Sequence, residues 1–145
     1  MDVIDELAAR LFALEVGARS TAAVTALIRN DIGRWAVGHG WHVRTEARVA
    51  VREAEHQAER IGYIDVVVLR GGDAPDLAIE IDSGDKPWSV TKLLHAAEAG
   101  MRPVWVRWGD DEWAGWCDAI DVIQLRSPRR RAARRDSRQL QLGLR

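Results

Sequence analysis

The chain has 145 residues, 47% of them hydrophobic, which is enough to bury the core of one domain with at most a tail besides it. Its single cysteine, Cys117, excludes a disulfide framework and favours a reducing, cytoplasmic environment. No apolar run is long enough to cross a membrane, and the acidic N-terminus lacks the basic region of a signal peptide.

Charge divides the chain into an acidic body and a basic end. Residues 126–145 carry eight arginines and one acid, for a net charge of +7, whereas residues 1–125 carry a net charge of −8. We therefore predict a domain over 1–125 and a flexible basic tail over 126–145 that meets a polyanion. A disordered end that only aids solubility is the alternative.

Periodicity and turn residues predict helices and strands along the whole body. Apolar residues at helical spacing predict the first two helices, and alternation or buried apolar runs bounded by Gly and Pro predict the strands. The expected order is helix 2–16, helix 22–37, strand 41–51, strand 62–69, strand 75–82, helix 85–99, strand 103–108 and a possible last strand 121–125.

Two of these strands carry acids inside apolar runs. Asp65 lies in strand 62–69, and Glu80 and Asp82 lie in strand 75–82, where alternation places them on one face. If the strands are neighbours, Asp65 can join the other two. Because clustered carboxylates repel each other, and hard oxygen ligands suit Mg²⁺ or Mn²⁺, the pattern favours a divalent cation site. A salt-bridged structural network is the alternative.

The order of a strand with Asp, a turn, a strand with Glu and an acid two residues later, and a helix resembles the PD-(D/E)XK nuclease superfamily. The resemblance covers roughly residues 21–108, and Gly62-Tyr-Ile-Asp65 stands where the family often has Gly-Arg-Ile-Asp. It implies an α/β fold with a restriction-endonuclease-like αβββαβ core, a mixed central sheet and, here, an extra N-terminal helix. The implied activity is metal-dependent DNA hydrolysis in repair, recombination or defence.

The resemblance also implies roles for particular residues. Asp65, Glu80 and the backbone carbonyl of Ile81 would hold Mg²⁺ or Mn²⁺. Asp82 occupies the place of the family's usual lysine and would join a second metal site or orient the water. Glu46 is a candidate for a further ligand, and so is Asp31, although both are more often solvated.

The chain has only two lysines, Lys86 and Lys92, and both follow the acidic strand closely. Lysine offers a compact charge with a tunable pKa, so either one is a candidate for the positive charge that position 82 lacks. Ordinary surface roles are the alternative. Trp88, at the entrance of the same helix, is a candidate for stacking on a DNA base, and a core role is the alternative.

The tail supplies candidate partner contacts. Its arginines are candidates for binding DNA: Arg129, Arg130, Arg131, Arg134 and Arg135. The terminal segment resembles the bacterial sliding-clamp-binding peptide through Gln139, Leu140, Leu142 and Leu144. We therefore expect a cytoplasmic, nucleoid-associated protein, with a homodimer left open. A catalytically inactive DNA- or clamp-binding adaptor and an interaction domain without nucleic acid are the rival interpretations.

Overall fold

The computed structural model describes residues 1–17, 19–109 and 117–126. The tail residues predicted to bind DNA and a sliding clamp therefore lie outside the described residues. The elements in the described part are α1 (Val3–Phe12), α2 (Thr21–Gly38), β1 (His42–Val51), β2 (Arg60–Leu69), β3 (Leu77–Asp82), α3 (Pro87–Glu98), β4 (Arg102–Gly109) and β5 (Asp121–Arg126).

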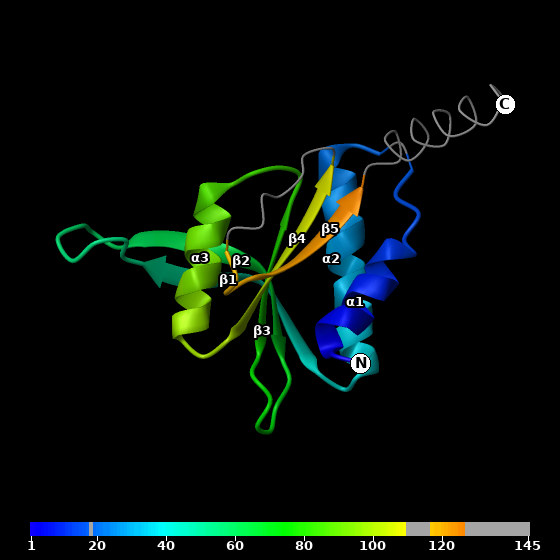
Figure 1. Ribbon diagram of the computed structural model, residues 1–145, viewed down its shortest axis with the longest axis horizontal. Helices are drawn as coiled ribbons and strands as arrows, with labels where there is room; N and C mark the ends of the chain where they lie inside the picture. The colour runs from blue at the N-terminus through cyan, green and yellow to red at the C-terminus, as the bar shows by residue number, and fades with distance from the viewer. Residues whose placement is uncertain (18, 110–116, 127–145) are drawn as a thin grey trace, which may run out of the picture.

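The strands form one mixed sheet in the order β1-β2-β3-β4-β5. Neighbours are antiparallel from β1 to β3 and parallel from β3 to β5. Helices α1 and α2 cover one face of the sheet and α3 covers the other (Figure 1). The predicted mixed α/β class and the order of the elements are thus confirmed. In the described part of the chain, no helix is long and apolar enough to cross a membrane.

The first helix is shorter than its apolar spacing predicted. It ends at Phe12, where the N–H groups of Ala13 and Leu14 bond three residues back, to Arg10 and Leu11, and tighten the last turn. Leu14 nevertheless packs against the core, and this explains why the apolar pattern continues beyond the helix. The second helix begins as predicted, because the Ser20 hydroxyl accepts a hydrogen bond from the Ala23 N–H at 3.2 Å.

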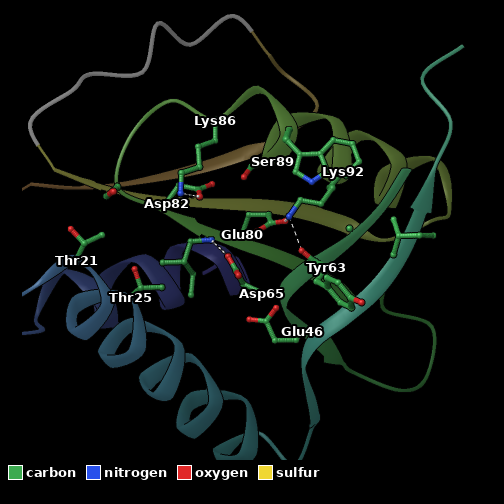
Figure 2. Close-up of a pocket in the computed structure, with 15 residues that line it drawn as sticks. Thr21, Thr25, Glu46, Tyr63, Asp65, Glu80, Asp82, Lys86, Ser89 and Lys92 are labelled. Atoms are coloured by element: carbon green, nitrogen blue, oxygen red, sulfur yellow. Dashed lines mark hydrogen bonds and ion pairs between the residues drawn. The ribbon is translucent and has the colours of Figure 1, made fainter. Parts of the chain in front are cut away.

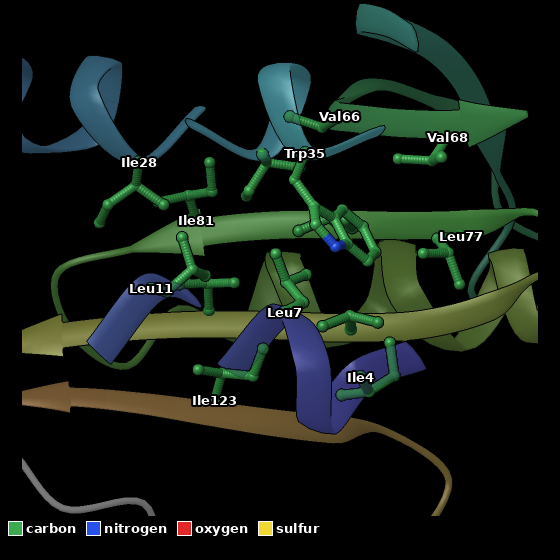
Figure 3. Packing of buried hydrophobic residues seen from close by; sticks show 14 of the residues in the cluster. Ile4, Leu7, Leu11, Ile28, Trp35, Val66, Val68, Leu77, Ile81 and Ile123 are labelled. Carbon is green, nitrogen blue, oxygen red and sulfur yellow. The ribbon is translucent and has the colours of Figure 1, made fainter. Parts of the chain in front are cut away.

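A separate core fills each face of the sheet. On the α1–α2 face, the apolar stripes of both helices pack on the strands (Figure 3). Its central members are fully buried: Leu7, Leu11, Ile28, Ile32, Val66, Ile79 and Val104. On the α3 face, Leu93 and Ala96 pack against Trp105 and Ala78. The central strands β3 and β4 are therefore covered on both sides, as their continuous apolar runs require.

Strand β1 reverses its faces at Glu46. Thr45 pairs with Val66 and Ala47 pairs with Ile64, but the pair between them, Glu46 with Asp65, is missing. Glu46 has a φ of 51°, in the left-handed region that side chains other than glycine rarely adopt. Ala47 packs on the α3 side, whereas Val43 packs on the α1–α2 side. The kink turns the distal part of β1 and β2, residues 47–64, into an arm with its own orientation.

Candidate active site

One pocket gathers all but one of the site residues that the sequence predicted within the folded body; Asp31 is the exception. The pocket has a volume of about 490 Å³ and lies among the N-terminus of α2, the base of the arm and the N-terminus of α3 (Figure 2). The predicted residues that line it are Glu46, Asp65, Glu80, Ile81, Asp82, Lys86, Trp88 and Lys92. They come from four elements and one loop, so the tertiary fold brings them together.

Asp65 lies at the point where β2 separates from β3. The two strands pair only from Val66 to Val68 on β2, opposite Leu77 to Ile79 on β3. Beyond that point the Asp65 carboxylate accepts a hydrogen bond from the Ile81 N–H at 2.8 Å, in place of a strand neighbour. The bond satisfies a buried backbone donor and fixes the carboxylate beside Glu80.

Glu80 is the most deeply buried acid described, with 1% of its surface exposed. Its carboxylate forms an ion pair with the ammonium group of Lys92. Burial, and after it the hydrogen bond and the negative charge of Asp65, raises the pKa of Glu80 to about 9, although Lys92 acts in the opposite direction. Burial and the neighbouring Asp65 thus favour the protonated form of Glu80.

Lys92 is held from three sides and is only 7% exposed. Its Nζ donates to the Tyr63 carbonyl at 2.6 Å as well as contacting Glu80. Its stem crosses β2 at Gly62, where an added Cβ would lie 2.9 Å from Lys92 Cδ and 2.7 Å from the ring of Trp88. Only glycine leaves room for both side chains, so Gly62 is what allows a helix lysine to reach Glu80.

Asp82 points to a different set of partners. Its Oδ2 accepts a hydrogen bond from Trp105 Nε1 at 2.8 Å, and its Oδ1 lies 3.3 Å from Lys86 Nζ. Asp82 also pairs in register with the buried Arg107 of β4, so the two side chains share a face. Asp82 is thus buried in a structural network, whereas the Lys86 side chain is 60% exposed at the rim.

The expected cluster of three carboxylates is therefore divided into a pair and a separate acid. Asp65 and Glu80 contact each other. Asp82 turns to Lys86 (Figure 2) and to Trp105. Over residues 1–17, 19–109 and 117–126, no three His, Cys, Asp or Glu side chains form a group that could hold a metal ion. A metal at this site would take fewer protein ligands than the sequence suggested.

The two further candidate ligands have different positions. Glu46 lines the pocket with an exposed carboxylate, 3.7 Å from the guanidinium of Arg29. Asp31 does not line the pocket. It is buried in α2 and accepts two hydrogen bonds from Arg10 of α1, at 3.0 and 3.1 Å. Asp31 therefore ties the two helices together, and the expectation of a ligand or a solvated acid was wrong.

Trp88 lines the pocket but is covered. The guanidinium of Arg60 lies 3.8 Å from its ring centroid, and its edge meets Gly62. The sequence-based choice missed Tyr63, Thr21 and Thr25, which line the same pocket. The two threonines are four residues apart and lie beside the apolar stripe of α2, and this spacing could have indicated that they share one face of the helix. Tyr63 offered none, because its neighbours predict only a buried strand.

Compared with protein-family models and with curated proteins, the chain matches none. A function therefore has to be inferred from the chemistry of the pocket.

The raised pKa of Glu80 predicts an unusual pH dependence of stability. Between pH 4.5 and about 9 the folded state holds a proton that the unfolded state has lost, so unfolding becomes easier as pH rises. In the presence of EDTA, the free energy of unfolding should fall by up to about 1.4 kcal/mol per pH unit. Glu80→Gln should flatten this slope and stabilise the protein at alkaline pH. Glu46→Gln, in the same pocket, should leave the slope unchanged; an unchanged slope in Glu80→Gln would contradict the assignment.

Proposed function

We propose that the protein is a metal-dependent deoxyribonuclease of the PD-(D/E)XK type. The observation that carries the proposal is the contact of Asp65, Glu80 and Lys92 at one pocket. Two carboxylates and a lysine supply what phosphodiester hydrolysis requires, namely oxygen ligands for a cation and a fixed positive charge near the phosphate. Such a set at the floor of a pocket is unexpected for residues that serve stability alone.

The arrangement of the elements supports the same class. The run α2-β1-β2-β3-α3-β4 follows the order of the family's αβββαβ core, with α1 as the extra N-terminal helix. The acids lie where the antiparallel strands β2 and β3 separate, and the lysine comes from the helix that follows. Repair, recombination and defence are the processes in which such an enzyme would act.

The residues present fit a magnesium or manganese ion. The pKa of Glu80 is raised partly because Asp65 adds a second negative charge, and a cation would relieve that repulsion. Magnesium is usually held by one or two carboxylates, with water and substrate phosphates completing its coordination, so a cage of three acids is unnecessary. Asp65, Glu80 and the Ile81 carbonyl would hold the ion. When bound, it would polarise the phosphate and activate a water molecule.

The side chains of the chain itself perform the remaining tasks. Lys92, fixed by the Tyr63 carbonyl, faces the acids and would neutralise charge that develops on the phosphate. Lys86, at the exposed rim, would attract the polyanion. Asp82 positions Lys86 through their ion pair. It would not act on the substrate itself, since its other oxygen accepts a hydrogen bond from Trp105.

The direct test is cleavage of supercoiled plasmid, linear duplex and single-stranded circular DNA with Mg²⁺ or Mn²⁺. We expect cleavage by the wild type, and a loss of about 10²-fold or more in Asp65→Asn and in Glu80→Gln. Glu46→Gln tests the remaining candidate ligand in the same pocket: a comparable loss would add Glu46 to the site, and unchanged cleavage would exclude it. Cleavage that survives both Asp65→Asn and Glu80→Gln would refute the assignment of the site.

One observation favours an inactive DNA-binding adaptor instead. The place of the family's lysine is taken by Asp82, and no group of three acids is found in the described part of the chain. An adaptor would bind DNA with the same affinity with or without Mn²⁺ and would cleave none of the panel. Binding of the tail to a sliding clamp would be compatible with either function. The residues of the tail that would make this contact lie outside the described residues.

A further inference from the structure

Tyr63 presents an exposed aromatic ring inside the pocket. Half of its surface is accessible, and Ile61, two residues earlier on the same face of β2, is 42% accessible. Of the large apolar side chains that the described residues leave exposed, only these two line the pocket. A half-exposed ring on a residue that lines a pocket is available for stacking, and a planar base is a suitable partner.

The backbone of Tyr63 also connects this ring to the site. Its carbonyl accepts the hydrogen bond from Lys92 Nζ at 2.6 Å, and Lys92 contacts Glu80. Tyr63 pairs with Arg48 across β1 and β2, so it is held in a regular ladder. The residue that carries the exposed ring therefore also contacts, through its backbone, the lysine that pairs with Glu80.

The depth of the pocket favours a DNA strand that is unpaired where it enters. Glu80 and Lys92 are almost completely buried, so the reacting phosphate has to enter the pocket. A volume of about 490 Å³ is typical of a small-ligand site and is of the size that takes a single nucleotide. A base can stack on a protein ring only after it has left the duplex stack.

Polar groups that could contact the strand's phosphates come from β1 and α2. The guanidinium of Arg48 shares a face with Tyr63, because directly paired residues project to the same side of a sheet. The hydroxyl-bearing residues Thr21 and Thr25 of α2 also line the pocket (Figure 2). Trp88 is unsuited to this task, since Arg60 already covers its ring.

We infer that the substrate is DNA with an unpaired strand at the point of cleavage, and that Tyr63 stacks on a base next to the scissile phosphate. The inference deepens the proposed nuclease function and rests on it. Tyr63 would then contribute to recognition, while Asp65, Glu80 and Lys92 carry the reaction.

The test uses the full chain and fluorescence anisotropy at raised ionic strength, where the arginines of the tail contribute least. The probes are labelled oligothymidylate, an abasic strand of equal length and a blunt duplex. The wild type should bind oligothymidylate at least about tenfold more tightly than the abasic strand, and Tyr63→Leu should lose about 5- to 100-fold of that affinity. Tyr63→Phe should retain it. Phe12→Leu, which alters an exposed ring on α1 outside the pocket, is the matched control.

Equal binding of the thymidylate and abasic strands by the wild type, or wild-type affinity in Tyr63→Leu, would overturn the inference. The wild-type comparison decides the matter even if a variant fails to fold. Cleavage separates this inference from the proposed function. Efficient duplex cleavage that depends on Asp65 but not on Tyr63 would overturn the inference and leave the nuclease intact. Base-dependent binding without any cleavage would overturn the nuclease and leave the strand-binding role.

Discussion

Replacing Lys92 with methionine should reduce DNA turnover by about 10²- to 10⁴-fold, the loss typical of a positioned catalytic group. Methionine keeps an unbranched stem of similar length, so the packing against Trp88 and Gly62 is retained while the charge is removed. The fold should survive, because Glu80, with its pKa raised to about 9, would be neutral at pH 7 without its partner. Single-turnover cleavage with saturating Mn²⁺ measures the effect, and circular dichroism checks the fold.

Lys86→Met is the matched control, since Lys86 is the other lysine of the chain and lines the same pocket. Its exposed charge contributes to attraction rather than to chemistry, so we expect a change in KM of less than about tenfold and little change in kcat. Equal losses of kcat in the two variants would mean that both sequence-predicted lysines act in the reaction. A normal kcat in Lys92→Met would remove Lys92 from the mechanism.

Asp82→Lys should destabilise the protein strongly, by about 3–5 kcal/mol of unfolding free energy, although it introduces the lysine of the PD-(D/E)XK pattern at that position. The new ammonium would lie beside the buried Arg107 across the β3–β4 pair and near Lys86. It would also leave the Trp105 indole N–H without its acceptor. Urea unfolding monitored by tryptophan fluorescence measures the change.

Asp82→Asn separates the two contributions, because an asparagine oxygen still accepts from Trp105 while the negative charge is lost. We expect it to cost about 1–2 kcal/mol, clearly less than the lysine variant. If Asp82→Lys were as stable as the wild type and more active, Asp82 would not be structural and the family's lysine position would still be functional here. The expected result makes Asp82 the structural partner of Trp105 and Lys86, on the same face of the sheet as Arg107.

Much of the fold follows from local rules. Alternation along β3 correctly placed Glu80 and Asp82 on one face, and the apolar runs correctly predicted buried strands. The geometry of the site was harder to predict from the sequence, because it depends on contacts between elements. The left-handed backbone at Glu46 reverses the faces of β1, and no residue pattern signals a positive φ at a glutamate. The buried partner of Asp82 is Trp105, which is 23 residues away in the chain.

The close approach at Gly62 has a consequence for tracing relatives of this chain. A lysine that reaches the acids from the helix needs a residue without a side chain where it crosses β2, whereas a lysine on β3 itself would not cross that strand. Gly62 and Lys92 should therefore change together during evolution. A search pattern of glycine three residues before the aspartate, and lysine twelve residues after the glutamate, should find proteins that share this design even where overall similarity has been lost.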